Sequence, residues 1–204
     1  MTELTGPAVG TEAERRPGRP RSERAEKAIV EATLDLLAAE SGVAGVSIEA
    51  VAARAGVGKT TIYRRWPNKE ALIVHALAAV KAPLPELSGA SVREDLVELA
   101  VALGAERKLK HVRCFWNVVG SAEKHPGLYA RYRQDLIEPR RAVMRAVLRR
   151  GVDDGVLRAD LDLEVVVSML VGTLSNRPPH EPLPEGYAET VVDTLLRGIG
   201  ASSG

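Results

Sequence analysis

Residues 47–69 constrain the fold more than any other stretch of the chain, and they read SIEAVAARAGVGKTTIYRRWPNK. The Ser47 hydroxyl can accept a hydrogen bond from a free amide of a first helical turn, and Gly56 can take the left-handed conformation that ends a helix. A second short helix is predicted from Lys59 to Arg65, and it ends before Pro67 because a proline pushes the preceding residue out of helical space. Two short helices joined at Gly56 are typical of a helix-turn-helix.

The second of these helices combines a buried residue with a polar face that suits DNA. Ile62 is expected to seal the crossing against Val51, while the small Ala52 lets the helices approach closely. The exposed face carries ammonium, hydroxyl, phenol and guanidinium groups, which suit phosphates and base edges in a major groove. These groups belong to Lys59, Thr60, Thr61, Tyr63 and Arg64, and Arg65 is a further candidate for a phosphate contact. The alternative is a helical hairpin with a solvated basic face, since such hairpins are common.

Charge and composition agree with an all-helical protein that binds a polyanion. The net charge is +1, but residues 15–69 hold eleven Lys and Arg against six Asp and Glu, a balance of +5. Such a concentration of basic charge is the footprint expected for a nucleic-acid partner. Aromatic residues make up only 3%, so a core of Ala, Leu and Val in packed helices is expected. No apolar run reaches about 18 residues, no secretory leader is recognisable, and Cys114 is the single cysteine, which together predict a cytoplasmic protein without a membrane partner.

The N-terminal part is expected to hold an arm followed by the DNA-binding domain. Residues 1–21 are predicted to be a disordered basic arm in which Arg15 to Arg21 cannot be helical because of Pro17 and Pro20. Its Arg19 and Arg21 could enter a minor groove, and the alternative is a solvated tail. Ser22 is expected to cap a helix over Glu23–Glu40 that Gly42 ends. The helix-turn-helix domain is assigned to residues 22–68.

Residues 69–204 are expected to form a helical effector-binding and dimerisation domain. Asn68 would cap a helix to about Lys81, and Lys69 sits in its first turn, where phosphate binds readily. Its buried candidates are Ala71, Leu72, Val74, His75, Leu77 and Ala78. Residues 82–90 are predicted to be a linker. Five more helices would bring the total to about nine: Ser91–Lys108, His111–Lys124, Gly127–Asp154 with a bend at Pro139, Asp162–Asn176, and Glu185–Gly198.

The last two predicted helices, Asp162–Asn176 and Glu185–Gly198, carry more apolar surface than one contact would cover. The residues expected to be exposed toward a partner are Val191, Val192, Leu195, Leu196 and Ile199. This pattern favours a homodimer in which each chain contributes two helices to a four-helix bundle. The alternative is an ordinary core layer of the monomer.

The stretch GVGKTTIYRRWPNKEAL at residues 56–72 resembles the recognition helix of the TetR family of bacterial transcriptional regulators, followed by that family's entry into the next helix. The resemblance implies an all-α homodimer with an N-terminal three-helix DNA-binding domain and a C-terminal body that encloses a small-molecule pocket. Ligand binding in that family usually releases a DNA operator. By resemblance, Ser47, Tyr63 and Lys69 would contact phosphates, and Lys59, Thr60 and Thr61 would read bases. Gly58 departs from the Ser or Thr common at its position, and Trp66 stands where Phe is commoner.

The effector is an unknown small molecule, and its pocket is expected among the middle helices. The candidates are His111, Cys114, Phe115, Trp116 and Met144, with His125 near them. His111 and Cys114 lie three residues apart on one helical face, but two ligands from one helix are not a metal site, so neither a metal nor another cofactor is expected. The guanidinium groups of Arg113, Arg140 and Arg141 are compatible with an anionic group on the ligand.

The sequence disfavours two other classes of function. A helical enzyme is disfavoured because Gly56–Thr61 lacks the spacing of a phosphate-binding loop and follows no strand, and because no nucleophile–base pair is recognisable. A nonspecific architectural DNA-binding protein would use the arm at residues 15–21. The large apolar C-terminal half argues against it, since such a protein needs no pocket.

Overall fold

The computed structural model describes residues 19–105, 109–175 and 184–200, and within these ranges the chain is helical, with one isolated bridge between Leu157 and Gly200. The all-α prediction is confirmed. The elements are α1 (Arg19–Ala38), α2 (Gly42–Gly45), α3 (Ile48–Ala55), α4 (Lys59–Tyr63), α5 (Lys69–Ala78), α6 (Val92–Ala105), α7 (Leu109–Gly120), α8 (Pro126–Tyr132), the π-helix η1 (Arg133–Ile137), α9 (Glu138–Asp153), α10 (Leu163–Ser175) and α11 (Tyr187–Ile199).

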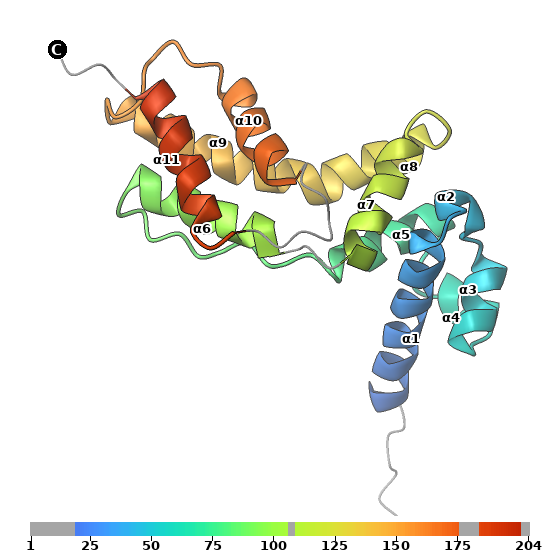
Figure 1. The fold of residues 1–204 in the computed structure, drawn as a ribbon. Helices are drawn as coiled ribbons and strands as arrows, with labels where there is room; N and C mark the ends of the chain where they lie inside the picture. Colours follow the sequence, from blue (N-terminus) through green and yellow to red (C-terminus); the bar gives the residue numbers. More distant parts are fainter. Residues whose placement is uncertain (1–18, 106–108, 176–183, 201–204) are drawn as a thin grey trace, which may run out of the picture.

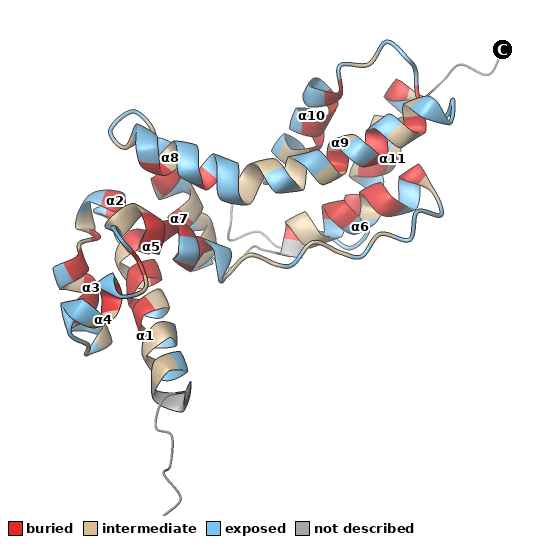
Figure 2. Ribbon diagram, turned by 180° about the vertical axis from the view of Figure 1, so that it is seen from behind, coloured by how far each residue is buried: buried red, intermediate tan, exposed pale blue. Residues whose placement is uncertain are grey.

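These helices pack around two hydrophobic cores. The first core joins α1 to α5 with α7 and α8, and the second joins α6, α9, α10 and α11. Figure 1 shows the two groups at opposite ends of an elongated molecule, with α8, η1 and α9 running from one to the other. The first core therefore extends past the predicted domain boundary at residue 69, because α5 and parts of α7 and α8 belong to it. Figure 2 shows buried residues, in red, on helices of both groups.

The first helix begins earlier than predicted. α1 starts at Arg19, so the prediction that residues 19–21 are non-helical is wrong. Pro20 lies in the first turn, where a missing N–H removes no intrahelical hydrogen bond. Ser22 therefore does not cap the helix, and its hydroxyl accepts a hydrogen bond from Arg65 instead. Residues 1–18, and the side chains of Arg19 and Arg21, lie outside the described residues.

The caps predicted at four other helix starts are confirmed. The Ser47 Oγ accepts from the Ala50 amide at 3.1 Å, and the Asn68 Oδ1 accepts from the Ala71 amide at 2.8 Å. Ser91 caps α6 through the Glu94 amide at 3.0 Å, and Asp162 caps α10 through the amide of residue 164 at 2.9 Å. Each side chain satisfies an amide of a first turn that has no helical partner.

Three predictions about burial and boundaries are wrong. In α5, His75 and Ala78 are exposed, whereas Ile73 and Ala76 are fully buried, because α5 packs mainly against α1 and α8 on another side of the helix. In α11, Val192 and Ile199 are buried within the same chain, mainly against α6. The short helix α2 follows α1, so Gly42, with φ 52°, opens a helix where it was expected to end one.

The predicted bend at Pro139 takes the form of a π-helical turn. In η1 the Glu138 amide donates to the Arg133 carbonyl, five residues back. Pro139 cannot donate to the carbonyl four residues before it, and its ring would clash with that group in a regular helix. The wider turn just before Pro139 accommodates this conflict, and single π-turns of this kind often occur at functional sites.

Candidate nucleic-acid interface and ligand pocket

A backbone hydrogen bond at the turn and the burial of Ile62 fix the geometry of the helix-turn-helix. Gly56 has φ 66°, and the next amide, that of Val57, donates to the Ala52 carbonyl at 3.0 Å. Ile62 is fully buried, which fixes the rotation of α4 against α3 and α1. The predicted turn chemistry is thus confirmed, and it determines which side of α4 faces outward.

The outward side of α4 carries the predicted polar groups. Lys59, Thr60, Tyr63 and Arg64 are exposed, with Tyr63 at 53%, and Thr61 is half-buried. Gly58 provides no side-chain cap, as its departure from the family pattern predicts. That these polar side chains of α4 contact DNA stays a prediction.

Lys59 forms an ion pair with Glu49 of α3 at 3.1 Å, and both side chains are more than half exposed. The pKa of Glu49 is lowered by a hydrogen bond from its own backbone amide and then by Lys59. Exposed pairs of this kind contribute little to stability. Lys59 can therefore leave the Glu49 carboxylate and bind a phosphate or a guanine edge with little loss of free energy.

Arg65 is used inside the domain, which corrects its assignment as a phosphate contact. Its Nη2 donates to the Ser22 carbonyl at 3.0 Å, its Nε lies 3.5 Å from a carboxylate oxygen of Glu26, and its side chain is only 16% exposed. Arg65 thus ties the end of α4 to α1. Lys69, by contrast, is half-buried in the first turn of α5, where its predicted phosphate contact remains compatible with the fold.

A pocket of about 510 Å³ lies between the two cores. It is lined from α5, α6, α7, α8, η1, α9 and α10, and four of the five predicted pocket residues take part: His111, Phe115, Trp116 and Met144. Phe115 forms an aromatic wall with Trp116, whose ring centroid is 5.0 Å away, and with Tyr132 at 6.2 Å. Trp116 is 45% exposed, so this wall reaches the surface.

Cys114 does not line the pocket, and that prediction is wrong. One residue along a helix turns a side chain by about 100°, so Cys114 is directed to a different side of α7 from Phe115, although it lies only about 60° from His111. It is fully buried against α1, where its thiol donates to the Leu34 carbonyl at 3.4 Å. Burial raises the pKa of the Cys114 thiol to about 11. Within the described ranges no three His, Cys, Asp or Glu side chains gather in a way that could hold a metal ion.

Basic side chains line part of the pocket, most of them from η1 and α9. Arg140 and Arg141 line it as predicted, whereas Arg113 and His125 do not. Lys81 and Arg133 also line it, and sequence reasoning missed both. A usable signal was the spacing of Arg133, Ile137, Arg141 and Met144 at intervals of four, four and three, which places them along one side of a helix.

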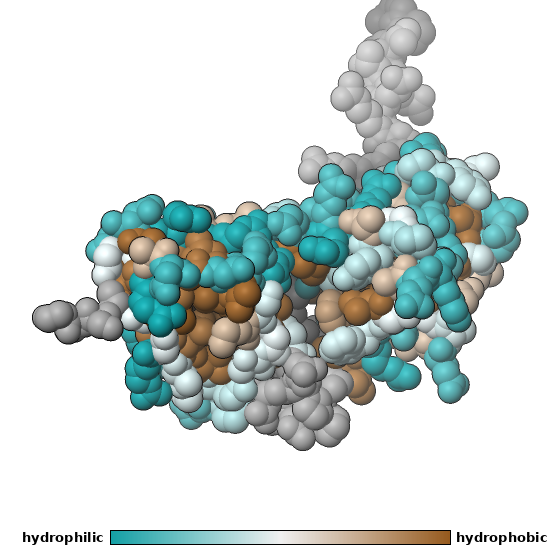
Figure 3. Space-filling view, turned by 90° about the horizontal axis from the view of Figure 1, so that it is seen from above, coloured by the Kyte–Doolittle hydropathy of each residue, from teal (hydrophilic) through white to brown (hydrophobic). Residues whose placement is uncertain are grey.

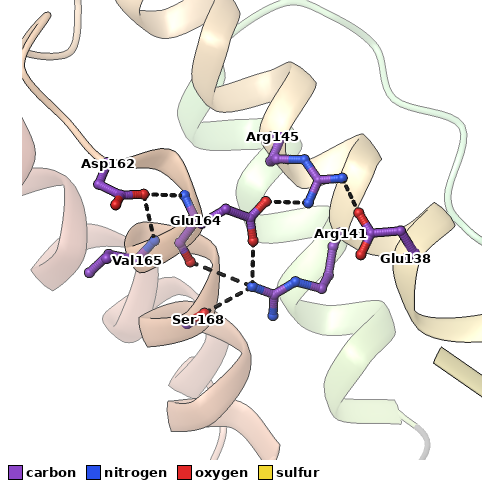
Figure 4. Close-up of polar contacts among 7 residues, drawn as sticks. All are labelled: Glu138, Arg141, Arg145, Asp162, Glu164, Val165 and Ser168. Atoms are coloured by element: carbon purple, nitrogen blue, oxygen red, sulfur yellow. Dashed lines mark hydrogen bonds and ion pairs between the residues drawn. The ribbon is translucent and has the colours of Figure 1, made fainter. Parts of the chain in front are cut away.

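Arg141 is held in place by a polar network between α9 and α10 (Figure 4). Its Nη2 donates to a Glu164 carboxylate oxygen at 2.8 Å and to the Ser168 hydroxyl at 2.9 Å. Arg145 bridges the same Glu164 to Glu138. The hydrogen bond from Arg141, and then that from Arg145, lowers the pKa of Glu164.

The other side of α7 is bonded to the DNA-binding part. Lys110 pairs with Glu31 and Asp35 of α1, and Asp35 also binds Arg54 of α3 at 3.0 Å. The hydrogen bond from Lys110 is the main cause of a lowered pKa at Asp35. Two turns after Lys110, the Asn117 Nδ2 donates to the Leu37 carbonyl at 2.8 Å. A single helix thus lines the pocket on one side and contacts the helix-turn-helix scaffold on the other.

In comparisons with known proteins, both halves of the chain match models of protein families. Residues 29–76 match the family model described as bacterial regulatory proteins, tetR family, and residues 88–195 match that of the tetracyclin repressor-like C-terminal domain. The HTH-type transcriptional regulator YdeS of Bacillus subtilis is 32% identical over 91% of this chain and 95% of its own length. The DNA-binding transcriptional repressor TetR of Mycobacteroides abscessus is 28% identical over 86% and 94%. The solved structure of the fatty acid degradation regulator FadR from Bacillus halodurans superposes with a TM-score of 0.66 at 18% identity, covering 90% of this chain and 98% of that one.

Proposed function

The chain belongs to the TetR family of DNA-binding transcriptional regulators, and from this premise we propose that it is a repressor that binds a palindromic operator as a homodimer and is released by a small-molecule effector. It would act in the cytoplasm, where a bacterial regulator binds the chromosome. No helix in the described ranges is long and apolar enough to cross a membrane.

The observation that carries the proposal is the outward face of α4. A buried Ile62 and an Arg65 bonded to α1 fix the helix, so Lys59, Thr60 and Tyr63 project from a rigid support. A recognition helix needs this combination, because base contacts discriminate only when their positions are fixed. Tyr63 and Lys69 would contact phosphates, together with Ser47 and Arg64, and Lys59 with Thr60 and Thr61 would read bases.

Homodimerisation is supported by the free side of α10. Val165 and Met169 lie one turn apart and are 52% and 54% exposed, and the exposed Gly172 continues the same side. Figure 3 shows hydrophobic side chains reaching the surface in the half of the molecule that carries α10 and α11. On α11, Val191 and Leu195 are half-buried one turn apart. A two-fold copy laid on this face would complete a four-helix bundle, with Val192 and Ile199 remaining in each chain's own core.

The dimer surface can be tested by one charge substitution. Met169→Asp would place a carboxylate in the proposed contact and should yield a monomer in sedimentation velocity, since an unpaired buried charge is strongly unfavourable. Val101→Asp on α6, which is 51% exposed outside the proposed surface, is the matched control and should remain dimeric. A dimeric Met169→Asp variant would count against this interface.

DNA binding is tested by a footprint on the DNA flanking the chain's own gene at two salt concentrations. A protected palindrome with half-sites about one helical turn or more apart is expected. Tyr63→Phe and Lys69→Gln should weaken binding to every sequence alike, and Lys69→Gln should lower the salt slope by about 1. Lys124→Gln, an exposed lysine near the start of α8, should change neither. Equal affinity for operator and scrambled DNA would instead favour the nonspecific architectural alternative.

A further inference from the structure

The composition of the pocket restricts the chemistry of its ligand. Of the residues that line it in the described ranges, four are Lys or Arg, and none is Asp or Glu. They come from three places: Lys81 follows α5, Arg133 opens η1, and Arg140 and Arg141 lie in α9. Several like charges around an apolar cavity repel one another, and this arrangement favours an anionic occupant.

The four basic groups are not equivalent. Arg141 is neutralised by Glu164 at 2.8 Å, and Arg140 donates to the Ala82 carbonyl. The Arg133 guanidinium, by contrast, takes part in no ion pair or hydrogen bond with any residue of the described ranges, and Arg133 is exposed. It is therefore the group best able to bind a ligand's charge without losing a bond of its own.

The rest of the pocket is apolar and aromatic. Phe115 and Trp116 meet edge to face, Phe115 also contacts Tyr132, and Trp116 is partly open to solvent. Such a wall suits a flat or hydrocarbon body. Arg133 begins the π-helical turn, and Ile137 at its other end also lines the pocket, so this irregular segment contributes both a charge and an apolar contact.

We propose that the pocket binds an amphipathic organic acid, with its ring or hydrocarbon body against Phe115 and Trp116 and its carboxylate held by Arg133. This inference rests on the proposed role of the pocket as an effector site. A guanidinium can hold a carboxylate through two parallel N–H···O bonds, which also orients the ligand. Arg141 and Arg140 extend the positive potential but keep their structural partners.

A pair of dyes that differ by one anionic group tests the proposal. 8-Anilinonaphthalene-1-sulfonate has an aromatic body and a sulfonate that stands in for the carboxylate, and N-phenyl-1-naphthylamine is the same body without charge. We expect the sulfonate dye to saturate at one site per chain. Arg133→Gln should weaken it by about tenfold, as removal of a charge-assisted bond does, while the neutral dye changes by less than about twofold by the same reasoning. Arg133→Lys should retain most of the affinity.

The control is Arg113→Gln, which removes an exposed arginine of α7 that does not line the pocket and should alter neither dye. The proposal is overturned when Arg133→Gln leaves sulfonate-dye binding unchanged, or weakens both dyes equally. These measurements use no DNA, so they are independent of the footprint. Arg133-dependent binding that leaves operator affinity unchanged would support the ligand class and contradict effector release.

Discussion

Replacing Asn117 by Ala should destabilise the contact between the pocket helix and the DNA-binding part. The Asn117 Nδ2 donates to the carbonyls of Leu37 at 2.8 Å and Ala39 at 3.3 Å, at the C-terminal end of α1. The last carbonyls of a helix have no helical donor. The Ala39 carbonyl also accepts from the Gly42 amide at 2.9 Å, so the Leu37 carbonyl depends more on Asn117.

The expected loss follows from this geometry. Two hydrogen bonds are removed, and the Leu37 carbonyl is left without its donor while the Ala39 carbonyl keeps that from Gly42, so the loss is about 2 kcal/mol. For a chain of this size, that loss lowers the midpoint of thermal unfolding by about 4–8 °C. Asn117→Asp should be at least as destabilising, because a carboxylate has no proton to donate and would face two carbonyl oxygens.

Thermal unfolding followed by circular dichroism at 222 nm measures the effect. Arg113→Ala, on the exposed side of the same helix, is the control and should change stability by less than about 0.5 kcal/mol. A midpoint for Asn117→Ala equal to that of the control would refute the capping argument. So would an Asp variant more stable than the Ala variant.

Three further outcomes are expected. Asp95→Asn should lower the free energy of unfolding by about 2 kcal/mol in chemical denaturation, since the fully buried carboxylate accepts from Arg150 at 2.6 Å and from the Gly89 amide at 3.2 Å. Burial alone would raise the pKa of Asp95, but the bonds from Arg150 and Gly89 outweigh it and lower the pKa, so this stabilisation is present above about pH 4 and is lost as the pH falls further. Cys114, with a pKa of about 11, should react with a thiol reagent at pH 8 only after denaturant is added, and rapid labelling of the native protein would contradict its burial. Gly56→Ala should cost about 1–2 kcal/mol in the same denaturation assay through its φ of 66° alone, because a Cβ there meets no atom within 4 Å.

The DNA-binding half was largely predictable because its signals are local. A cap such as Ser47 or Asn68 acts on an amide three residues away, and Gly56 determines its own backbone conformation. Two predictions in this half failed, one at a proline near a helix start and one at a side chain with a distant partner. Pro20 looked like a helix breaker although a first turn tolerates proline, and Arg65 looked like a DNA contact although Ser22, 43 residues earlier, binds it.

The pocket was predictable only in part because it forms between two cores. Phe115 and Trp116 were predicted from their clustering, but Tyr129 and Tyr132 on α8 were not. The assignment of Cys114 required knowing which side of α7 faces α1. The same ambiguity affected α11, where periodicity identified an apolar side but could not tell a partner chain from α6. In both cases the helix was predicted well and its rotation was not.

The orientation of α7 about its own axis determines how an effector in the pocket would act. Lys110, Cys114 and Asn117 bond α7 to α1, and Lys110 continues through Asp35 to Arg54 on α3. Parting these surfaces would leave several polar groups unpaired at once, each at a cost of about 1–3 kcal/mol. A ligand can shift an equilibrium only by its difference in affinity for the two states. A ligand that moves α7 would therefore carry α1 and α3 with it as one body. The conformational change would then occur where the two cores meet, at the π-helical turn η1 and along residues 79–91 between α5 and α6.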